Sequence, residues 1–161
     1  MRVGIGYDIH RLKKGNDLIL GGLNIPHNKG LIGHSDADVL THALIDALLG
    51  AAALGDIGSY FPDNDPQFKN ISSLILLKKT ITLLENKNYN INNIDLIVIA
   101  ENPKISPHKK DIIDKLTDVL KIKENKINLK ATTAEGLGFV GKEKGIAAKV
   151  IVSIIKTLHE K

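Results

Sequence analysis

The stretch Gly6-Tyr7-Asp8-Ile9-His10, taken with the later stretch His34-Ser35-Asp36-Ala37-Asp38-Val39-Leu40-Thr41-His42, decides how this chain is interpreted. The first stretch lies in a predicted strand, where side chains two apart, such as Asp8 and His10, point to the same face. The second stretch opens a predicted helix that carries His42. One carboxylate and two imidazoles can bind zinc, and three protein ligands leave the open fourth position of a catalytic site. We therefore predict a zinc site on these three side chains; the alternative is a set of buried polar residues.

The composition limits the classes of protein to which the chain can belong. Of its 161 residues, 43% are hydrophobic and only 4% aromatic, so we expect one domain over 1–161 with an aliphatic core. Cysteine is absent, which excludes disulfides, thiolate zinc sites and cysteine catalysis. The net charge is +4, but only Arg2 and Arg11 are arginine, and aromatic residues are scarce, so we predict no nucleic-acid partner. The basic excess would still attract a small polyanionic substrate.

Hydropathy bears on where the protein resides. No run of about 18 apolar residues is present, so we expect no membrane partner. The first residues, Met1-Arg2-Val3-Gly4-Ile5, have no signal or transit pattern. We expect a cytoplasmic protein, or one of a plastid-type organelle if a transit peptide has been removed.

Periodicity predicts a chain in which strands and helices mix as α/β or α+β. We expect the α+β (mixed α/β) class, with a ferredoxin-like mixed sheet of about four main strands and helices on one face. Gly21-Gly22, between Leu18–Leu20 and Leu23–Ile25, predicts a small N-terminal hairpin. Ser35 is the expected N-cap of the first helix, and Gly55 its expected end. Strands are expected at 2–9, 94–101, 127–133 and 146–157 (the last with a helix as alternative), and helices at 36–54, 71–87 and 107–121.

One strand indicates an assembly larger than the single chain. In Ile94-Asp95-Leu96-Ile97-Val98-Ile99 both faces are largely apolar. Helices can cover one face only, so we expect a partner subunit on the other.

Several loops suit phosphates or hydroxyls, each with a plain structural alternative. His34 and Ser35 stand at a predicted helix N-terminus, which favours an anion; the alternative for Ser35 is a simple cap. Gly55–Gly58 and Phe61–Asp65 could hold a ligand or form ordinary turns. In Lys130–Phe139, threonine hydroxyls suit phosphate oxygens, and Glu135 would need a cation between itself and those phosphates; the alternative is a glycine-rich turn.

The remaining histidines and one further aspartate receive no ligand role. Asp46 lies one helical turn beyond His42, so we expect it to accept a hydrogen bond behind that ring rather than to bind metal. His27, His108 and His159 lie in polar or terminal surroundings, and we assign them no function.

Together these motifs resemble the 2-C-methyl-D-erythritol 2,4-cyclodiphosphate synthase family over essentially the whole chain. The resemblance implies one Zn²⁺ per chain on Asp8, His10 and His42. It also implies a Mg²⁺ or Mn²⁺ ion held by Glu135 and the substrate phosphates. The implied assembly is a homotrimer with active sites between subunits. The motifs that carry the resemblance are Gly6–His10, His34–Asp38, Asp46–Gly58, Phe61–Asp63, Pro107-His108, Lys130–Thr133 and Gly138-Phe139.

The reaction that the resemblance implies starts from 4-diphosphocytidyl-2-C-methyl-D-erythritol 2-phosphate. The 2-phosphate attacks the β-phosphorus, CMP leaves, and the cyclic diphosphate forms. His34 and Thr133 would stabilise the transition state. Residues 100–106 and 131–133 of the adjacent subunit would hold the CDP part, and Asp56, Gly58 and the Phe61–Asp65 loop would hold the methylerythritol part. Substrate contacts are implied for Asp8, His10, His34, Ser35, Asp56, Ile57, Gly58, Phe61, Pro62, Asp63, Asn64, Asp65, Ala100, Glu101, Asn102, Pro103, Lys104, Ile105, Ser106, Ala131, Thr132, Thr133, Ala134, Glu135, Phe139 and Lys142.

Departures from the family pattern and two rival functions complete the prediction. Glu101 is acidic where an uncharged residue is common, and Lys142 replaces a frequent arginine, which changes a planar fork to a point charge. Ala134 and Gly136 also vary. The first rival is a zinc-dependent nucleotide phosphoesterase, which would need an activated water. The second is a trimeric phosphate- or nucleotide-binding module with structural zinc.

Overall fold

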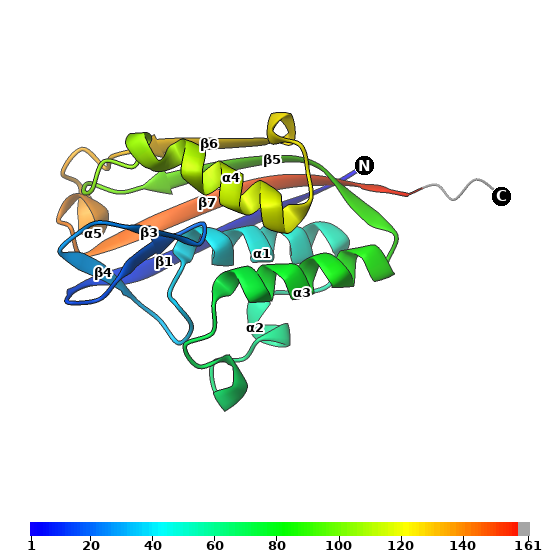
Figure 1. The fold of residues 1–161 in the computed structure, drawn as a ribbon, viewed down its shortest axis with the longest axis horizontal. Coiled ribbons are helices and arrows are strands. Elements are labelled where there is room, and N and C mark those ends of the chain that lie inside the picture. Colours follow the sequence, from blue (N-terminus) through cyan, green and yellow to red (C-terminus); the bar gives the residue numbers. More distant parts are fainter. Residues whose placement is uncertain (158–161) are drawn as a thin grey trace.

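Five strands form the main sheet of the computed structural model, which describes residues 1–157, and three long helices cover one of its faces (Figure 1). The strand order is β4-β1-β7-β5-β6, and β2 and β3 form a separate hairpin. The strands are β1 Arg2–Lys14, β2 Leu18–Leu20, β3 Leu23–Ile25, β4 Lys29–Ile32, β5 Tyr89–Ile99, β6 Ile127–Thr132 and β7 Gly145–Lys156. The helices are α1 Val39–Ala52, α2 Ile57–Tyr60, α3 Ser73–Asn86, α4 Lys109–Leu120 and α5 Gly138–Gly141, with short 3₁₀ turns η1 Pro66–Phe68, η2 Ser106–His108 and η3 Glu124–Lys126.

The sheet confirms the mixed α+β prediction and corrects its strand count. β1 and β5 run antiparallel to β7, whereas β5 and β6 are parallel. The expectation of about four strands missed β4, which pairs with the second half of β1. The segment contains Gly30, a residue depleted in strands, but a Cβ there would lie 2.0 Å from the Asp17 carbonyl oxygen, so glycine is needed for close packing. The ferredoxin-like description stays a prediction.

The first helix begins later than predicted, and its cap is Asp38 rather than Ser35. The Asp38 side chain is fully buried and accepts the Thr41 amide at 3.0 Å and the Thr41 hydroxyl at 2.7 Å. It also accepts the amides of Gly21 and Gly22, at 2.9 and 2.7 Å. Both glycines have positive φ, as the tight turn of the predicted β2–β3 hairpin requires. One carboxylate therefore fixes the helix start and the hairpin turn together.

The other elements occur close to where periodicity placed them. The predicted strand at 146–157 is a strand, β7, and not the alternative helix. Strand β1 is longer than predicted because its last residues pair with the unforeseen β4. Helix α1 ends at Ala52, and Ala53 takes the left-handed cap conformation expected of Gly55. The loop at 55–70 contains α2 and η1.

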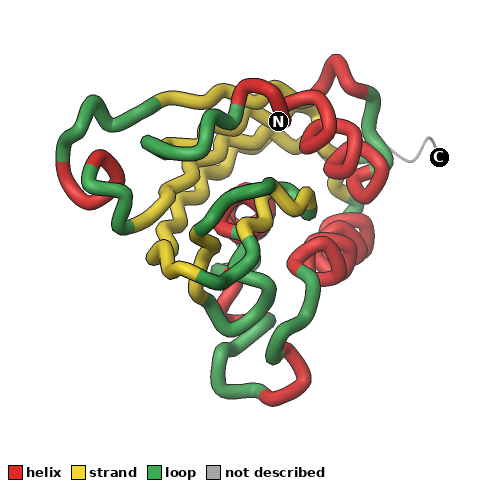
Figure 2. The backbone as a smooth tube through the Cα atoms, turned by 60° about the vertical axis from the view of Figure 1, so that its left-hand side comes forward, coloured by secondary structure: helices red, strands yellow, loops and turns green. Residues whose placement is uncertain are grey.

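The two faces of the sheet differ in what covers them. In Figure 2 the long helices gather on one side of the strands. The opposite side of β1 exposes four apolar residues, with exposed fractions from 62% for Val3 to 40% for Ile9. Ile151 and Ile155 of β7 are also exposed. No helix within residues 1–157 is long and apolar enough to cross a membrane.

Candidate functional site

Two glycines bring helix α1 against strand β1 and so position the predicted metal ligands. A Cβ on Gly4 would lie 2.0 Å from the Ala47 carbonyl oxygen, and one on Gly6 would lie 1.9 Å from that of Ala43. Helix α1 can therefore lie this close to strand β1 only because residues 4 and 6 have no side chain. Residues 4, 6, 8 and 10 share the face of β1 that meets α1. This contact places the side chain of His42 beside those of Asp8 and His10.

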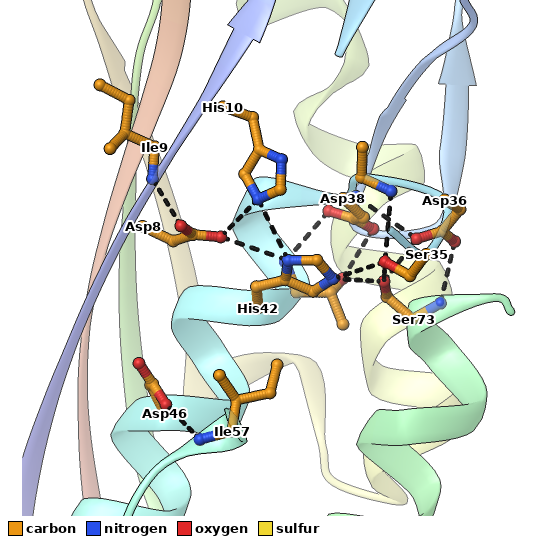
Figure 3. A network of polar contacts seen from close by, with 12 residues as sticks. Asp8, Ile9, His10, Ser35, Asp36, Asp38, His42, Asp46, Ile57 and Ser73 are labelled. Carbon is orange, nitrogen blue, oxygen red and sulfur yellow. Dashed lines mark hydrogen bonds and ion pairs between the residues drawn. The ribbon is translucent and has the colours of Figure 1, made fainter. Parts of the chain in front are cut away.

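The three predicted ligands converge on one point, and they form the candidate metal cluster of residues 1–157 (Figure 3). Asp8 Oδ2 lies 2.8 Å from His10 Nε2 and 3.2 Å from His42 Nδ1, and the two ring nitrogens are 3.3 Å apart. Zinc bonds of about 2.0–2.2 Å in a tetrahedron separate neighbouring ligand atoms by about 3.3–3.6 Å. The donor set and its spacing therefore fit a zinc-sized cation, with the shorter Asp8–His10 distance being that of a hydrogen bond.

The charges in this cluster favour a cation. Burial alone would raise the pKa of Asp8, but hydrogen bonds from His10 and His42, when both nitrogens of each ring carry a proton, outweigh burial and hold that pKa well below its usual range. Burial would lower the pKa of His10, but the bond and the charge of Asp8 raise it. The carboxylate thus stays ionised and attracts positive charge, whether as protons on the rings or as a metal ion.

Strand β4 fixes the orientation of the His10 ring. His10 Nδ1 lies 2.8 Å from the Ile32 carbonyl oxygen, which can only accept, so Nδ1 must donate. In the neutral ring this leaves the lone pair on Nε2, the nitrogen that faces Asp8 and His42. A backbone partner behind a ligand ring is a common feature of protein metal sites.

The expected role of Asp46 behind His42 is wrong. Asp46 Oδ1 accepts the Ile57 amide at 2.7 Å and thereby anchors α2. The far nitrogen of His42, Nε2, instead meets the hydroxyls of Ser73 at 2.8 Å and Ser35 at 3.0 Å. Sequence reasoning missed Ser73, because a serine at a predicted helix start indicates only a cap.

A cavity of about 400 Å³ opens over the triad. His34 and Ser35 line it from the loop before α1, and His34 Nε2 lies 3.4 Å from the Asp65 carbonyl oxygen. Predicted contact residues in its wall are Asp8, His10, His34, Ser35, Ile57, Gly58, Phe61, Pro62 and Asp63; residues that the sequence did not indicate are Gly33, Phe68 and Leu76.

Three predicted contact residues of the same region do not line this cavity. The Asp56 carboxylate caps α2, where it accepts the Ser59 amide at 2.9 Å and the Ser59 hydroxyl at 2.7 Å. Those bonds lower the pKa of Asp56. Asp65 accepts the Gln67 amide at 3.0 Å and so caps η1, and Asn64 lies beside it. The sequence did not indicate this local capping, which engages the carboxylates of Asp56 and Asp65.

The segments predicted to contact the nucleotide lie elsewhere on the chain, at the carboxyl ends of the parallel strands β5 and β6. Glu101 Oε2 accepts the Ala134 amide at 3.2 Å and so joins the two loops. Ala100 and Ile105 are buried, so only their backbones could meet a ligand. None of the predicted residues Ala100–Ser106 or Ala131–Glu135 lines the cavity over the triad.

The predicted contact residues outside the cavity include two on helix α5 or its cap, Phe139 and Lys142, and others in the loops after β5 and β6. Thr133 donates its hydroxyl to Glu135 Oε1 at 2.8 Å. Phe139 is 45% exposed on α5, and Lys142 caps that helix at its carboxyl end. Asn102 donates to Glu143 Oε1 at 2.7 Å, and Lys29 donates to Glu143 Oε2 at 2.9 Å.

The histidines without an assigned role lie apart from the triad. His27 follows β3, and its Nε2 is buried without a hydrogen-bond partner. His108 ends η2 before α4. His159 lies outside the described residues.

Comparison with known proteins gives consistent relationships. A protein from Clostridium botulinum strain Okra called 2-C-methyl-D-erythritol 2,4-cyclodiphosphate synthase is 57% identical, over 94% of this chain and 97% of that protein. A synthase of the same name from Syntrophomonas wolfei is 53% identical over 96% and 98%.

Solved structures agree with these relationships. An IspF from Plasmodium falciparum, solved as a CDP complex, superposes with a TM-score of 0.86 at 39% identity, covering 98% of this chain and 97% of that one. The bifunctional IspDF from Campylobacter jejuni gives a TM-score of 0.94 at 40% identity and 97% coverage, and this chain spans 42% of its length. The model of the YgbB family matches residues 1–155. The chain belongs to the YgbB family.

Proposed function

We propose that this chain converts 4-diphosphocytidyl-2-C-methyl-D-erythritol 2-phosphate to 2-C-methyl-D-erythritol 2,4-cyclodiphosphate and CMP, in the non-mevalonate route to isoprenoids. The observation that carries this proposal is 57% identity to a synthase of that name over nearly the full length of both chains. The cluster of Asp8, His10 and His42 could hold a metal ion, and it would supply the cation site that a substrate with three phosphate groups requires. The substrate brings its own nucleophile, so the enzyme mainly positions groups and neutralises charge.

Asp8, His10 and His42 would hold Zn²⁺, one ion per chain. When bound, the ion supplies Lewis-acid polarisation of a phosphoryl oxygen and a template for the reacting groups. Around it, His34 and Ser35 face the cavity, where they can donate to phosphate oxygens. The 2-phosphate oxygen forms the new bond to the β-phosphorus as the bond from that phosphorus to the CMP oxygen breaks.

The cavity wall beyond the triad suits the methylerythritol part of the substrate. Ile57 and Phe61 contribute apolar surface, and Gly58 exposes backbone. Asp63 offers a carboxylate to sugar-like hydroxyls. Asp56, Asn64 and Asp65 would reach this part only from the rim, because two of these side chains cap helices.

The cytidine part would be held by a neighbouring copy of the chain. A relative of this family has been solved with CDP, and the segments predicted to contact that group do not line the cavity of their own chain. A homotrimer would also supply a partner for the open apolar face of the sheet, which includes Val3 and Ile5. Light scattering should give about three times 17.5 kDa; an active monomer would contradict the shared site.

A Mg²⁺ or Mn²⁺ ion would join Glu135 to the substrate phosphates, and Thr133 would stabilise the charge that develops in the transition state. Glu135 has a positive φ of 50° and receives the Thr133 hydroxyl, so the two functional groups are already adjacent. A bare carboxylate beside a phosphate would repel it, which is why the cation is needed at this position.

Product identification tests the proposed function. The protein is incubated with the cytidine diphosphate substrate and magnesium, and the products are followed by phosphorus NMR. A cyclic diphosphate together with CMP supports the proposal, whereas an open phosphate indicates the zinc phosphoesterase. The metal assignment is tested separately by atomic emission: wild type should carry about one zinc per chain, and His42→Ala should lose it, since affinity depends on ligand number.

A further inference from the structure

We propose that Ser73 and Asp36 form a hydrogen-bond relay that holds His42 in the tautomer presenting Nδ1 to the metal triad. Ser73 is then a positioning residue, which acts on the metal through His42 without binding it. This inference rests on the proposed metal site, and it assigns a role to the first turn of α3.

The relay is a partly buried chain of polar contacts that joins helices α1 and α3 through the loop before α1 (Figure 3). His42 Nε2, on α1, lies 2.8 Å from Ser73 Oγ, and the Ser73 side chain is fully buried. Ser73 donates its hydroxyl to Asp36 Oδ1. Asp36 Oδ2 also accepts the Ser73 amide at 2.9 Å, so the carboxylate holds both the side chain and the backbone of the residue that begins α3.

The number of available protons fixes the direction of the relay. The Asp36 carboxylate can only accept, so the single hydroxyl proton of Ser73 must point to Asp36. Ser73 Oγ then presents a lone pair to His42, and Nε2 must carry the proton for the 2.8 Å contact to be a hydrogen bond. A neutral imidazole with its proton on Nε2 has its lone pair on Nδ1, the atom that faces Asp8 and His10.

The opposite tautomer is less favourable. It would allow Nδ1 to donate to Asp8 Oδ2 at 3.2 Å and Nε2 to accept the Ser35 hydroxyl at 3.0 Å, but it would hold the lone pairs of Nε2 and Ser73 Oγ against each other at 2.8 Å. The contact with Ser73 is the shortest polar contact of the His42 ring, and it is a hydrogen bond only in the first tautomer.

Ser35 is compatible with the same arrangement. Its hydroxyl oxygen accepts the Ala37 amide at 3.3 Å and lies 3.0 Å from His42 Nε2, where it can share the Nε2 proton. The hydroxyl proton of Ser35 can then point to Ser73 Oγ, 3.4 Å away, or into the cavity that this residue lines. The two serines therefore differ: Ser73 orients the ligand ring, whereas Ser35 can also contact substrate.

The tautomer can be measured directly in metal-free wild-type protein by nitrogen NMR, at a pH well above the usual pKa of imidazole. The two ring nitrogens of His42, assigned by comparison with His42→Ala, differ in chemical shift according to which carries the proton. We expect the proton on Nε2, and Ser73→Ala should give a mixture of tautomers. A proton on Nδ1 in wild type overturns the relay, even if Ser73→Ala does not fold.

Zinc affinity provides a second measurement, by competition with a chromophoric chelator. Ser73→Ala should bind zinc about 10- to 100-fold more weakly, the usual effect of removing a partner behind a ligand histidine. The matched control is Thr80→Val, which removes another fully buried hydroxyl from α3, one that donates to Leu76 rather than to the site. Its zinc affinity should stay that of wild type.

The outcomes separate this inference from the proposed function. Equal zinc affinity in Ser73→Ala and wild type overturns the relay and leaves the metal site intact. Equal losses in Ser73→Ala and Thr80→Val would mean a general effect on α3, which also overturns it. If wild type binds no zinc, the proposed metal site fails, and the tautomer measurement alone then decides whether the relay exists.

Discussion

Replacing Asp38 with asparagine should destabilise the fold far more than such a conservative change usually does. Each carboxylate oxygen accepts two donors: Oδ1 those of the Gly21 and Thr41 amides, and Oδ2 those of the Gly22 amide and the Thr41 hydroxyl. An amide group has one oxygen, so two of these donors would meet an NH₂ group instead. The Thr41 hydroxyl can rotate and accept, but a backbone N–H cannot.

The expected loss can be estimated from these contacts. At least one backbone N–H is left buried without an acceptor, which costs about 1–3 kcal/mol, and the remaining bonds lose the charge of the carboxylate. Burial of the Asp38 carboxylate costs free energy, as its raised pKa indicates, and the neutral asparagine avoids this cost, which offsets part of the loss. We expect a net loss of about 2–3 kcal/mol in the free energy of unfolding. With a urea slope of about 2 kcal/mol/M, the midpoint should fall by about 1–1.5 M.

The assay is urea unfolding followed by far-ultraviolet circular dichroism, at one protein concentration because association shifts the midpoint. The control is Asp114→Asn, which removes the charge of an exposed ion pair with Lys110 on α4 and should cost less than about 0.5 kcal/mol. If Asp38→Asn has the midpoint of this control, the four-donor account of Asp38 is refuted.

Three further outcomes follow from the same contacts. Glu135→Gln should keep its zinc and its assembly but turn over about 10²-fold more slowly and need more magnesium, since one preorganised charge is lost. If a kinetic titration with magnesium gives the same curve for the variant and wild type, Glu135 is a turn residue only. Gly6→Ala should prevent folding or lower the free energy of unfolding by about 1–3 kcal/mol or more, because its Cβ would overlap the α1 backbone. Gly50→Ala, on α1, meets no atom within 4 Å and should raise the free energy of unfolding by about 0.5–1 kcal/mol. Equal urea midpoints for the two variants would contradict this. Burial would raise the pKa of Asp95, but the hydrogen bonds from Lys130 and Asn128 lower it overall. The stabilising contribution of Asp95 is therefore present above its pKa in the unfolded chain and is lost as the pH falls through its pKa in the folded protein. Lys130→Met should raise the pKa of Asp95 in a carboxyl carbon NMR titration, and an unchanged pKa would exclude the ion pair as the cause of the shift.

The sequence predicted the long elements and the Asp8–His10 pair because both depend on short-range spacing, whereas His42, 34 positions from Asp8, was identified by its motif. Asp8 and His10 are brought together by strand geometry alone, and His42 by a helix that begins next to a recognisable motif. The β2–β3 hairpin was predicted from Gly21-Gly22, whose positive φ values no larger residue adopts easily.

What the sequence did not predict depends on contacts between distant residues. The cap of α1 is Asp38 rather than Ser35 because the hairpin, some 17 positions earlier in the chain, supplies two further donors. Asp46 accepts the amide of Ile57 instead of a hydrogen bond from His42. The contact expected of Asp46 is made by Ser73, which is 31 positions from His42. Strand β4 was missed because its glycine has a tertiary reason that periodicity does not record.

The open face of the sheet has a consequence for how the protein folds. Val3, Ile5, Tyr7 and Ile9 point to that face from one strand, and Ile151 lies on the same side of the neighbouring strand. If the proposed homotrimer covers this surface, a newly made chain exposes it before association, and productive association then competes with aggregation. Both processes speed up with concentration, so slow, dilute refolding with stepwise addition of chain is the condition under which the proposed assembly should form in highest yield.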